Sequence, residues 1–190
     1  MAVDGSVVAD GRGRPVTVIA SGGFGLGNLE TSRGWGEGLR GTRCCFEYTR
    51  VEPWLPGPAP RRGADRDADE VLAVAAQVGA TQAIGMSRGA VAVLAVLAEH
   101  PHPFRRVVLV VPPAGEAVGR YRQLLDGTGA APADVEILAL GMRGDRGHPA
   151  AVAQTWAEKL GGSVEILPSA RQAPGVLDDM KAACWSFLNR

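Results

Sequence analysis

Short apolar runs alternate with longer amphipathic segments along most of this chain. Runs of strand length lie at 15–20, 43–48, 81–86, 106–111, 135–140 and 163–167, and the first of them is rich in β-branched residues. The segment 65–78 places apolar residues on one helical face, and 87–99 is apolar on nearly every face. Further helices are expected near 116–126, 149–160 and 174–188. The pattern therefore predicts strands and helices in alternation.

Continuously apolar strands joined by helix-length segments are typical of a parallel sheet covered on both faces. We expect an α/β fold with a mostly parallel central sheet of about six strands. The segment 51–65, rich in Pro, Arg and Gly, predicts a long loop, and residues 1–14 predict a frayed hairpin. With 190 residues and no internal repeat, the sequence predicts a single domain over 1–190.

Composition narrows the range of partners. The net charge is zero, so neither nucleic acid nor an anionic membrane surface is an expected partner. No apolar run reaches the ~18 residues of a membrane span, and the N-terminus lacks signal-peptide features, which predicts a cytoplasmic location. The odd number of cysteines (Cys44, Cys45 and Cys184) favours reduced, buried thiols over a disulfide framework.

The stretch 85–90, Gly-Met-Ser-Arg-Gly-Ala, lies between an expected strand and an expected helix. A serine at such a turn exposes its hydroxyl, and the helix N-terminus behind it favours developing negative charge. Side chains at Gly85 or Gly89 would crowd the turn. Ser87 is therefore a candidate nucleophile, although the turn and the helix N-cap alone could also account for a serine here.

Loops at the carboxyl ends of the strands are where a parallel sheet binds ligands. The glycine-rich run 22–27 follows the first expected strand, and Glu47 ends the next, which invites a dinucleotide interpretation. The spacing is not G-x-G-x-x-G, however, and the segment containing Gly34, Gly36 and Gly38 is a poor helix. No cluster of His, Cys or carboxylates has metal-ligand spacing, so neither a metal nor another cofactor is expected.

From residue 15 to 188 the chain resembles the α/β-hydrolase family. Residues 21–25, Ser-Gly-Gly-Phe-Gly, look like that family's oxyanion loop, and 85–90 like its nucleophile elbow. The resemblance implies that the backbone N–H groups of Arg88 and of Gly23 or Phe24 form an oxyanion hole. It also puts Asp145 in the position of the catalytic acid. The segment between the fourth and fifth strands leaves no room for a lid domain.

The family's catalytic histidine has no counterpart at the expected place, because Gln172 stands there. A glutamine amide cannot act as a general base. His100 and His102 follow the helix after Ser87, which puts them roughly 20 Å from its hydroxyl. His148, three residues after Asp145 in a loop at the correct sheet edge, is the candidate for a displaced base. The alternative is a loop histidine that only precedes the next helix.

Two functions follow from the resemblance. The first is a serine hydrolase or acyl-transfer enzyme acting on an ester, thioester or lactone, with Ser87, His148 and Asp145 as an atypical triad. Its substrate would be a small-molecule or carrier-tethered acyl group in an open pocket that includes Glu47 and Gln172. The second is a non-hydrolytic protein on this fold, either an elimination or cyclisation enzyme or a ligand-binding pseudoenzyme.

Some of these site residues have simpler interpretations. Asp145 lies in a turn-like sequence and could be a solvated turn residue. Glu116 is a weaker rival for the acid. The Arg88 side chain could hold a carboxylate or a phosphate, although a surface position is the simpler expectation.

Overall fold

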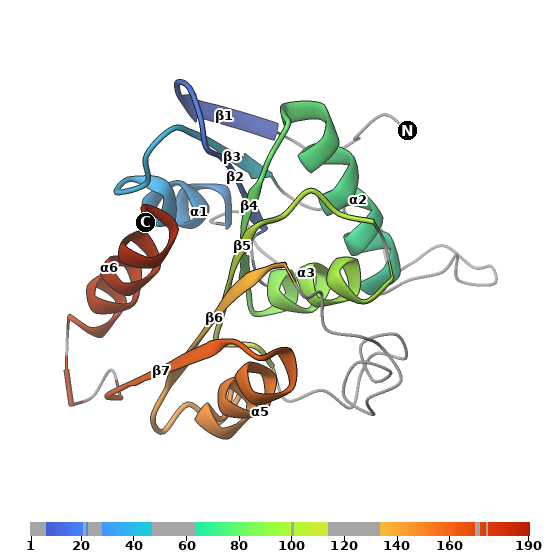
Figure 1. The fold of residues 1–190 in the computed structure, drawn as a ribbon. Helices are drawn as coiled ribbons and strands as arrows, with labels where there is room; N and C mark the ends of the chain where they lie inside the picture. Colours follow the sequence, from blue (N-terminus) through green and yellow to red (C-terminus); the bar gives the residue numbers. More distant parts are fainter. Residues whose placement is uncertain are drawn as a thin grey trace, which may run out of the picture.

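The computed structural model describes residues 7–20, 22, 28–46, 64–99, 101–113, 134–169, 172–173 and 175–190. Its strands are β1 (Val7–Gly11), β2 (Val16–Ala20), β3 (Thr42–Phe46), β4 (Gln82–Met86), β5 (Arg106–Val110), β6 (Glu136–Met142) and β7 (Ser163–Leu167). They form one sheet in the order β1-β3-β2-β4-β5-β6-β7 (Figure 1). Only the pairing of β1 with β3 is antiparallel. The mostly parallel α/β sheet expected from the sequence is confirmed.

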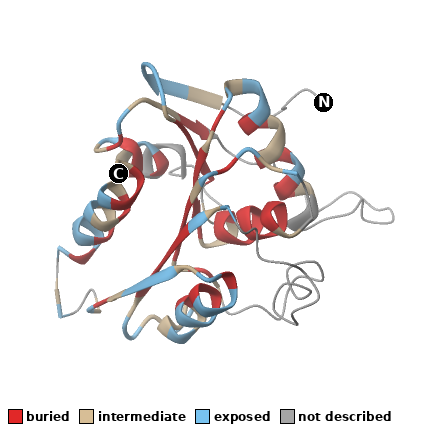
Figure 2. Cartoon of the chain, viewed as in Figure 1, coloured by how far each residue is buried: buried red, intermediate tan, exposed pale blue. Residues whose placement is uncertain are grey.

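Helices cover both faces of this sheet. On one face lie α2 (Ala64–Val78), α3 (Arg88–Glu99) and α5 (Ala150–Leu160), and on the other lie α1 (Asn28–Gly36) and α6 (Val176–Leu188) (Figure 1). The central strands and α3 are buried almost throughout, whereas the outer helices are buried on one side only (Figure 2). This layering explains why the sequence of α3 is apolar on nearly every face.

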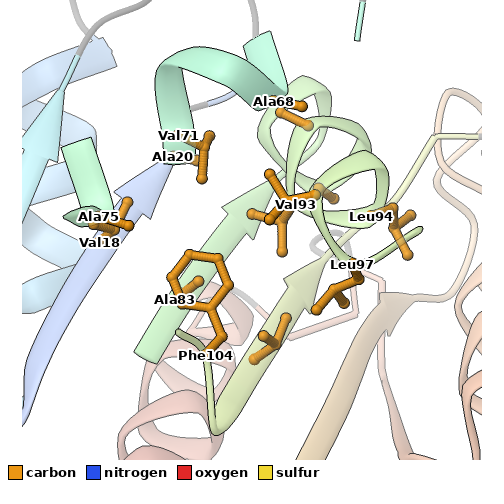
Figure 3. Packing of buried hydrophobic residues seen from close by; sticks show 14 of the residues in the cluster. Val18, Ala20, Ala68, Val71, Ala75, Ala83, Val93, Leu94, Leu97 and Phe104 are labelled. Carbon is orange, nitrogen blue, oxygen red and sulfur yellow. The ribbon is translucent and has the colours of Figure 1, made fainter. Parts of the chain in front are cut away.

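The core on the α2 and α3 side consists mainly of small aliphatic side chains. Val18 and Ala83 of the sheet belong to one buried cluster with Val71 of α2 and Val93 of α3, and Phe104, just before β5, belongs to it too (Figure 3). All five are 2% exposed or less. Burying a valine or larger side chain contributes about 1.5–3 kcal/mol. This packing fixes α3 against β4, and therefore fixes the turn between them.

Within the described residues the sheet has seven strands rather than about six, and residues 1–6 of the expected N-terminal hairpin lie outside them. The additional strand is β1, which pairs with β3 instead of the adjacent β2. It was missed because it is half exposed and contains Asp10 and Gly11, residues that are rare in strands. Asp10 nevertheless has a function there, because its carboxylate accepts a 3.0 Å bond from the Arg43 guanidinium of β3.

The expectation of a poor helix in the segment with Gly34, Gly36 and Gly38 is wrong for its first part, because α1 contains Gly34 and ends at Gly36. Gly36 allows close approach to neighbouring elements. A Cβ on Gly36 would lie 3.2 Å from Ile19 Cδ1 of β2. Trp35 is 6% exposed and anchors the helix to the core. Tertiary packing thus overrides the low intrinsic helix propensity of glycine.

The remaining helices begin and end close to the expected residues, except that the helix expected near 116–126 lies outside the described residues. Among those that are described, no helix has the length and apolar character needed to cross a membrane.

Candidate active site

Ser87 occupies a sharp turn between β4 and α3. Its φ of 49° lies in the left-handed region, which is uncommon for a residue other than glycine. Hydrogen bonds hold the turn on both sides: the Ser87 N–H donates to the Val110 carbonyl of β5 at 2.9 Å, and its carbonyl accepts from the Ala90 N–H at 2.9 Å. The serine is thus fixed at the carboxyl edge of the sheet, one residue before the helix begins.

Two glycines make room for this turn. A Cβ on Gly85 would lie 2.6 Å from the Gly89 carbonyl oxygen, so only glycine lets α3 approach the end of β4 so closely. Gly22, which follows β2, lies against the other side of the turn, where a Cβ would come within 2.9 Å of the Ser87 Cβ. The loop after β2 therefore starts directly beside the serine.

His148 and Asp145 lie on the loop between β6 and α5, at the same edge of the sheet. His148 Nε2 is 2.8 Å from Ser87 Oγ, and His148 Nδ1 is 3.1 Å from Asp145 Oδ2. The other carboxylate oxygen, Oδ1, accepts the backbone N–H groups of Gly147 at 2.9 Å and of His148 at 3.0 Å. The loop thus orients its own acid, and the acid in turn contacts the ring.

This arrangement fixes which imidazole nitrogen carries the proton. An ionised carboxylate only accepts hydrogen bonds, so Asp145 selects the tautomer with hydrogen on Nδ1. Nε2 is then an acceptor, directed at the serine hydroxyl. The His148 and Asp145 side chains are 27% and 20% exposed, so the contact is only partly shielded from water. A serine, an imidazole and a carboxylate in this order can perform nucleophilic catalysis.

Arg88, directly after the serine, is not a simple surface residue. Its guanidinium donates two hydrogen bonds to Asp67 of α2, from Nε to Oδ2 and from the Nη2 group to Oδ1, both at 2.6 Å. This side chain thus binds a carboxylate of the protein itself, and the expected binding of a ligand's carboxylate or phosphate stays a prediction. The Asp67 side chain is 7% exposed. The sequence signals Asp67 only as an acidic residue in a first helical turn.

A second strained residue lies beside the turn. Val111 has a φ of 41°, an outlier for a β-branched residue. It follows Val110, whose carbonyl accepts the Ser87 N–H, and its own N–H donates to Leu140 of β6 at 2.8 Å. Backbone strain of this kind concentrates at functional sites. The sequence offers no signal for it, since valine is an ordinary strand residue.

The other predicted site residues divide into two groups. Gln172 belongs to the described residues and is exposed. Its backbone N–H donates to the Ser169 carbonyl at 2.8 Å. Lying outside the described residues are the expected oxyanion-loop and pocket residues Gly23, Phe24 and Glu47, the rival acid Glu116, and His100. The oxyanion hole and the open pocket therefore stay predictions.

The remaining histidine and the cysteines take no part in this cluster. His102 stacks on Phe104 with ring centroids 5.9 Å apart, and burial lowers its pKa. All three cysteines are buried and free. Burial raises the pKa of Cys45 to about 11 and that of Cys184 to about 12, so neither is a nucleophile at neutral pH. Within the described ranges no group of three or more potential ligands could hold a metal ion.

Comparisons with known proteins identify the fold. No protein-family model and no curated protein matches the sequence. Solved structures do match: an esterase from Exiguobacterium antarcticum has 14% identity and a TM-score of 0.71, with 97% of this chain and 95% of that chain covered. A monoacylglycerol lipase from Paleococcus ferrophilus has 13% identity and a TM-score of 0.73, with 97% and 98% covered.

A hydrolase from Pseudomonas aeruginosa PA01 has 13% identity and a TM-score of 0.70, with 97% of this chain and 94% of that chain covered. Identities this low establish the fold and not the chemistry. The chain has the α/β-hydrolase fold.

Proposed function

We propose that this protein is a serine hydrolase or acyl-transfer enzyme in which Ser87 is the nucleophile, His148 the general base and Asp145 the orienting acid. The observation that carries the proposal is the chain of contacts from Ser87 Oγ through the imidazole to Asp145, at 2.8 and 3.1 Å. These lengths are within the range of a catalytic triad before substrate binds. The esterase and lipase among the structural neighbours favour the same class.

In this proposal Ser87 Oγ attacks the carbonyl carbon of an acyl substrate while His148 Nε2 takes its proton. Asp145 holds Nδ1–H and stabilises the imidazolium that forms. The Arg88 N–H, together with that of Gly23 or Phe24, donates to the developing oxyanion. His148 then returns the proton to the leaving group, and an acyl-serine remains. Water, or an acceptor hydroxyl or thiol, releases the acyl group by the same steps in reverse order.

In this proposal the general base lies on a different loop from the one that the family resemblance implies. The resemblance implies a histidine on the loop after β7, where this chain has Gln172. In the proposal His148 replaces it from the loop after β6, so that acid and base lie three residues apart. The substrate class is an ester, thioester or lactone, small or carrier-tethered, and the expected setting is the cytoplasm.

A fluorophosphonate probe tests this assignment, because it labels only an activated serine. We expect the wild type to be labelled, and Ser87→Ala and His148→Ala to be silent. Two matched variants should be labelled like the wild type: Ser186→Ala, at an exposed position of α6, and His102→Ala. Absence of labelling in the wild type at any pH would instead favour the non-hydrolytic alternative, a protein that uses the pocket without a covalent step.

A further inference from the structure

A cavity lies at the opposite end of the sheet from Ser87. Its volume is about 510 Å³, within the range of small-molecule sites. Gln82, the first residue of β4, and Thr81 directly before it line the cavity, whereas Ser87 follows the end of the same strand. Five residues at ~3.3 Å each separate the two ends. The cavity therefore does not belong to the candidate active site.

The walls of this cavity are held by hydrogen bonds from the end of α6. Gln82 Nε2 donates to the Leu188 carbonyl at 2.7 Å, and Arg106 Nη1 donates to the backbone oxygen of Arg190 at 3.0 Å. Asn189 Oδ1 accepts the Arg40 N–H at 2.9 Å. Gln82 is 5% exposed and also accepts a bond from Thr17. These contacts join β4, β5 and the segment after α1, so the cavity is preformed.

The lining is strongly basic in a chain whose net charge is zero. The charged side chains that line the cavity are five arginines and one glutamate, namely Arg14, Arg40, Arg105, Arg106, Arg190 and Glu136. Glu136 pairs with Arg106 at 3.1 Å, and Arg105 pairs with Asp134 at 3.6 Å in an exposed contact. Within the described part of the chain, no ion pair engages the guanidinium of Arg14 or of Arg40. The positive charges of Arg14 and Arg40, which no carboxylate of the described residues matches, attract an anion.

We propose that this cavity binds a small organic phosphate, a phosphate monoester or diphosphate on a compact apolar or ring-containing body. Arginine presents a planar fork that matches phosphate oxygens in bidentate geometry. The volume exceeds that of a lone phosphate, and Pro15 and Leu188 supply apolar lining for the rest of such a molecule. Arg14 and Arg40 would hold the phosphate.

Calorimetry and thermal unfolding with pyrophosphate and with ADP test the proposal. A ligand that binds only the folded state raises Tm. We expect one molecule of either probe to bind per chain, ADP more tightly, and Arg14→Gln and Arg40→Gln each to weaken binding about tenfold. The double variant should lose the Tm increase.

Arg33→Gln, an exposed arginine on α1 that does not line the cavity, is the matched control and should bind like the wild type. Sodium chloride at the same ionic strength separates specific binding from screening. The proposal is overturned if the chloride reproduces the Tm increase, if the double variant keeps it, or if neither probe binds at millimolar concentration. Binding to phosphatidic acid vesicles without ADP binding would also overturn it, since the proposed ligand is soluble. None of these readouts depends on activity at Ser87.

Discussion

Asp145 has two separate tasks in its loop. One carboxylate oxygen accepts two backbone N–H groups and shapes the turn, while the other meets the imidazole of His148 at 3.1 Å. A carboxylate is needed for the second task more than for the first, because only a pure acceptor selects the tautomer with hydrogen on Nδ1. The proposed mechanism therefore makes a sharp distinction between aspartate and asparagine at this position.

Asp145→Asn should lower kcat for a model ester such as p-nitrophenyl acetate on the order of 10⁴-fold, because an amide can donate to Nδ1 and leave the proton on Nε2. Tm should change far less. Asp178→Asn is the matched control, since that carboxylate is 84% exposed and paired with Lys181. Equal kcat in Asp145→Asn and the wild type would contradict the role of Asp145.

Gln172→Ala should leave labelling by the fluorophosphonate probe unchanged. Gln172 is exposed, and the proton acceptor in our proposal is His148. Labelling rates of the variant and the wild type, compared at one probe concentration, check this. A large loss would mean that the loop after β7 contributes a catalytic group after all.

At the scale of elements, the junction of β4 and α3 carries the site. The strand ends at Met86 and the helix begins at Arg88, so Ser87 alone turns the chain. The turn depends on Gly85, because the Gly89 carbonyl oxygen occupies the space that a side chain at position 85 would need. The junction is also tied to α2 through the bidentate pair of Arg88 and Asp67.

Gly85→Ala should destabilise the fold by about 3 kcal/mol, because the new methyl group meets backbone that cannot move aside. Urea unfolding measures this. Gly175→Ala, before α6, should change stability little, since a Cβ there meets nothing within 4 Å. If both variants are equally stable, the close approach of α3 to β4 is not what requires glycine.

Asp67→Asn should cost about 2 kcal/mol, because it removes the charge from two hydrogen bonds to a guanidinium. Asp134→Asn provides the comparison, since its pair with Arg105 is 72% and 80% exposed and should contribute little. Urea unfolding of Asp67→Asn and Asp134→Asn measures the loss in free energy of unfolding for each variant. Similar values for the two variants would show that the contact between α2 and α3 does not depend on this pair.

At the scale of the whole molecule, most of the fold could be predicted, because continuous apolar strands and amphipathic helices leave a strong pattern. The pattern failed at β1, whose exposed face and Asp10 hide a strand, and at α1, where packing favours a glycine at Gly36. Ser87 and His148 were candidates because each follows a strand at one sheet edge, and Asp145 because the family resemblance puts it in the position of the acid. The contact of Arg88 with Asp67 and the strain at Val111 could not be predicted, since both arise from the meeting of separate segments.

The cysteines report on the integrity of the whole core. At pH 8, Ellman's reagent should react with none of the three thiols of the folded protein, because burial keeps their pKa values above 9 and the thiols protonated. All three should react once the protein is unfolded in denaturant. Rapid stoichiometric reaction of the folded protein would mean that β3, which holds Cys44 and Cys45, or α6, which holds Cys184, opens readily.

The central claim is that an imidazole on the loop after β6 activates Ser87. Chemical rescue tests it most directly: His148→Gly leaves a gap beside the serine that free imidazole can enter. We predict that the variant is labelled by a fluorophosphonate only when imidazole is added, at a rate that rises with its concentration, and that Ser87→Ala is never labelled. Labelling of His148→Gly at the wild-type rate without imidazole would contradict the account.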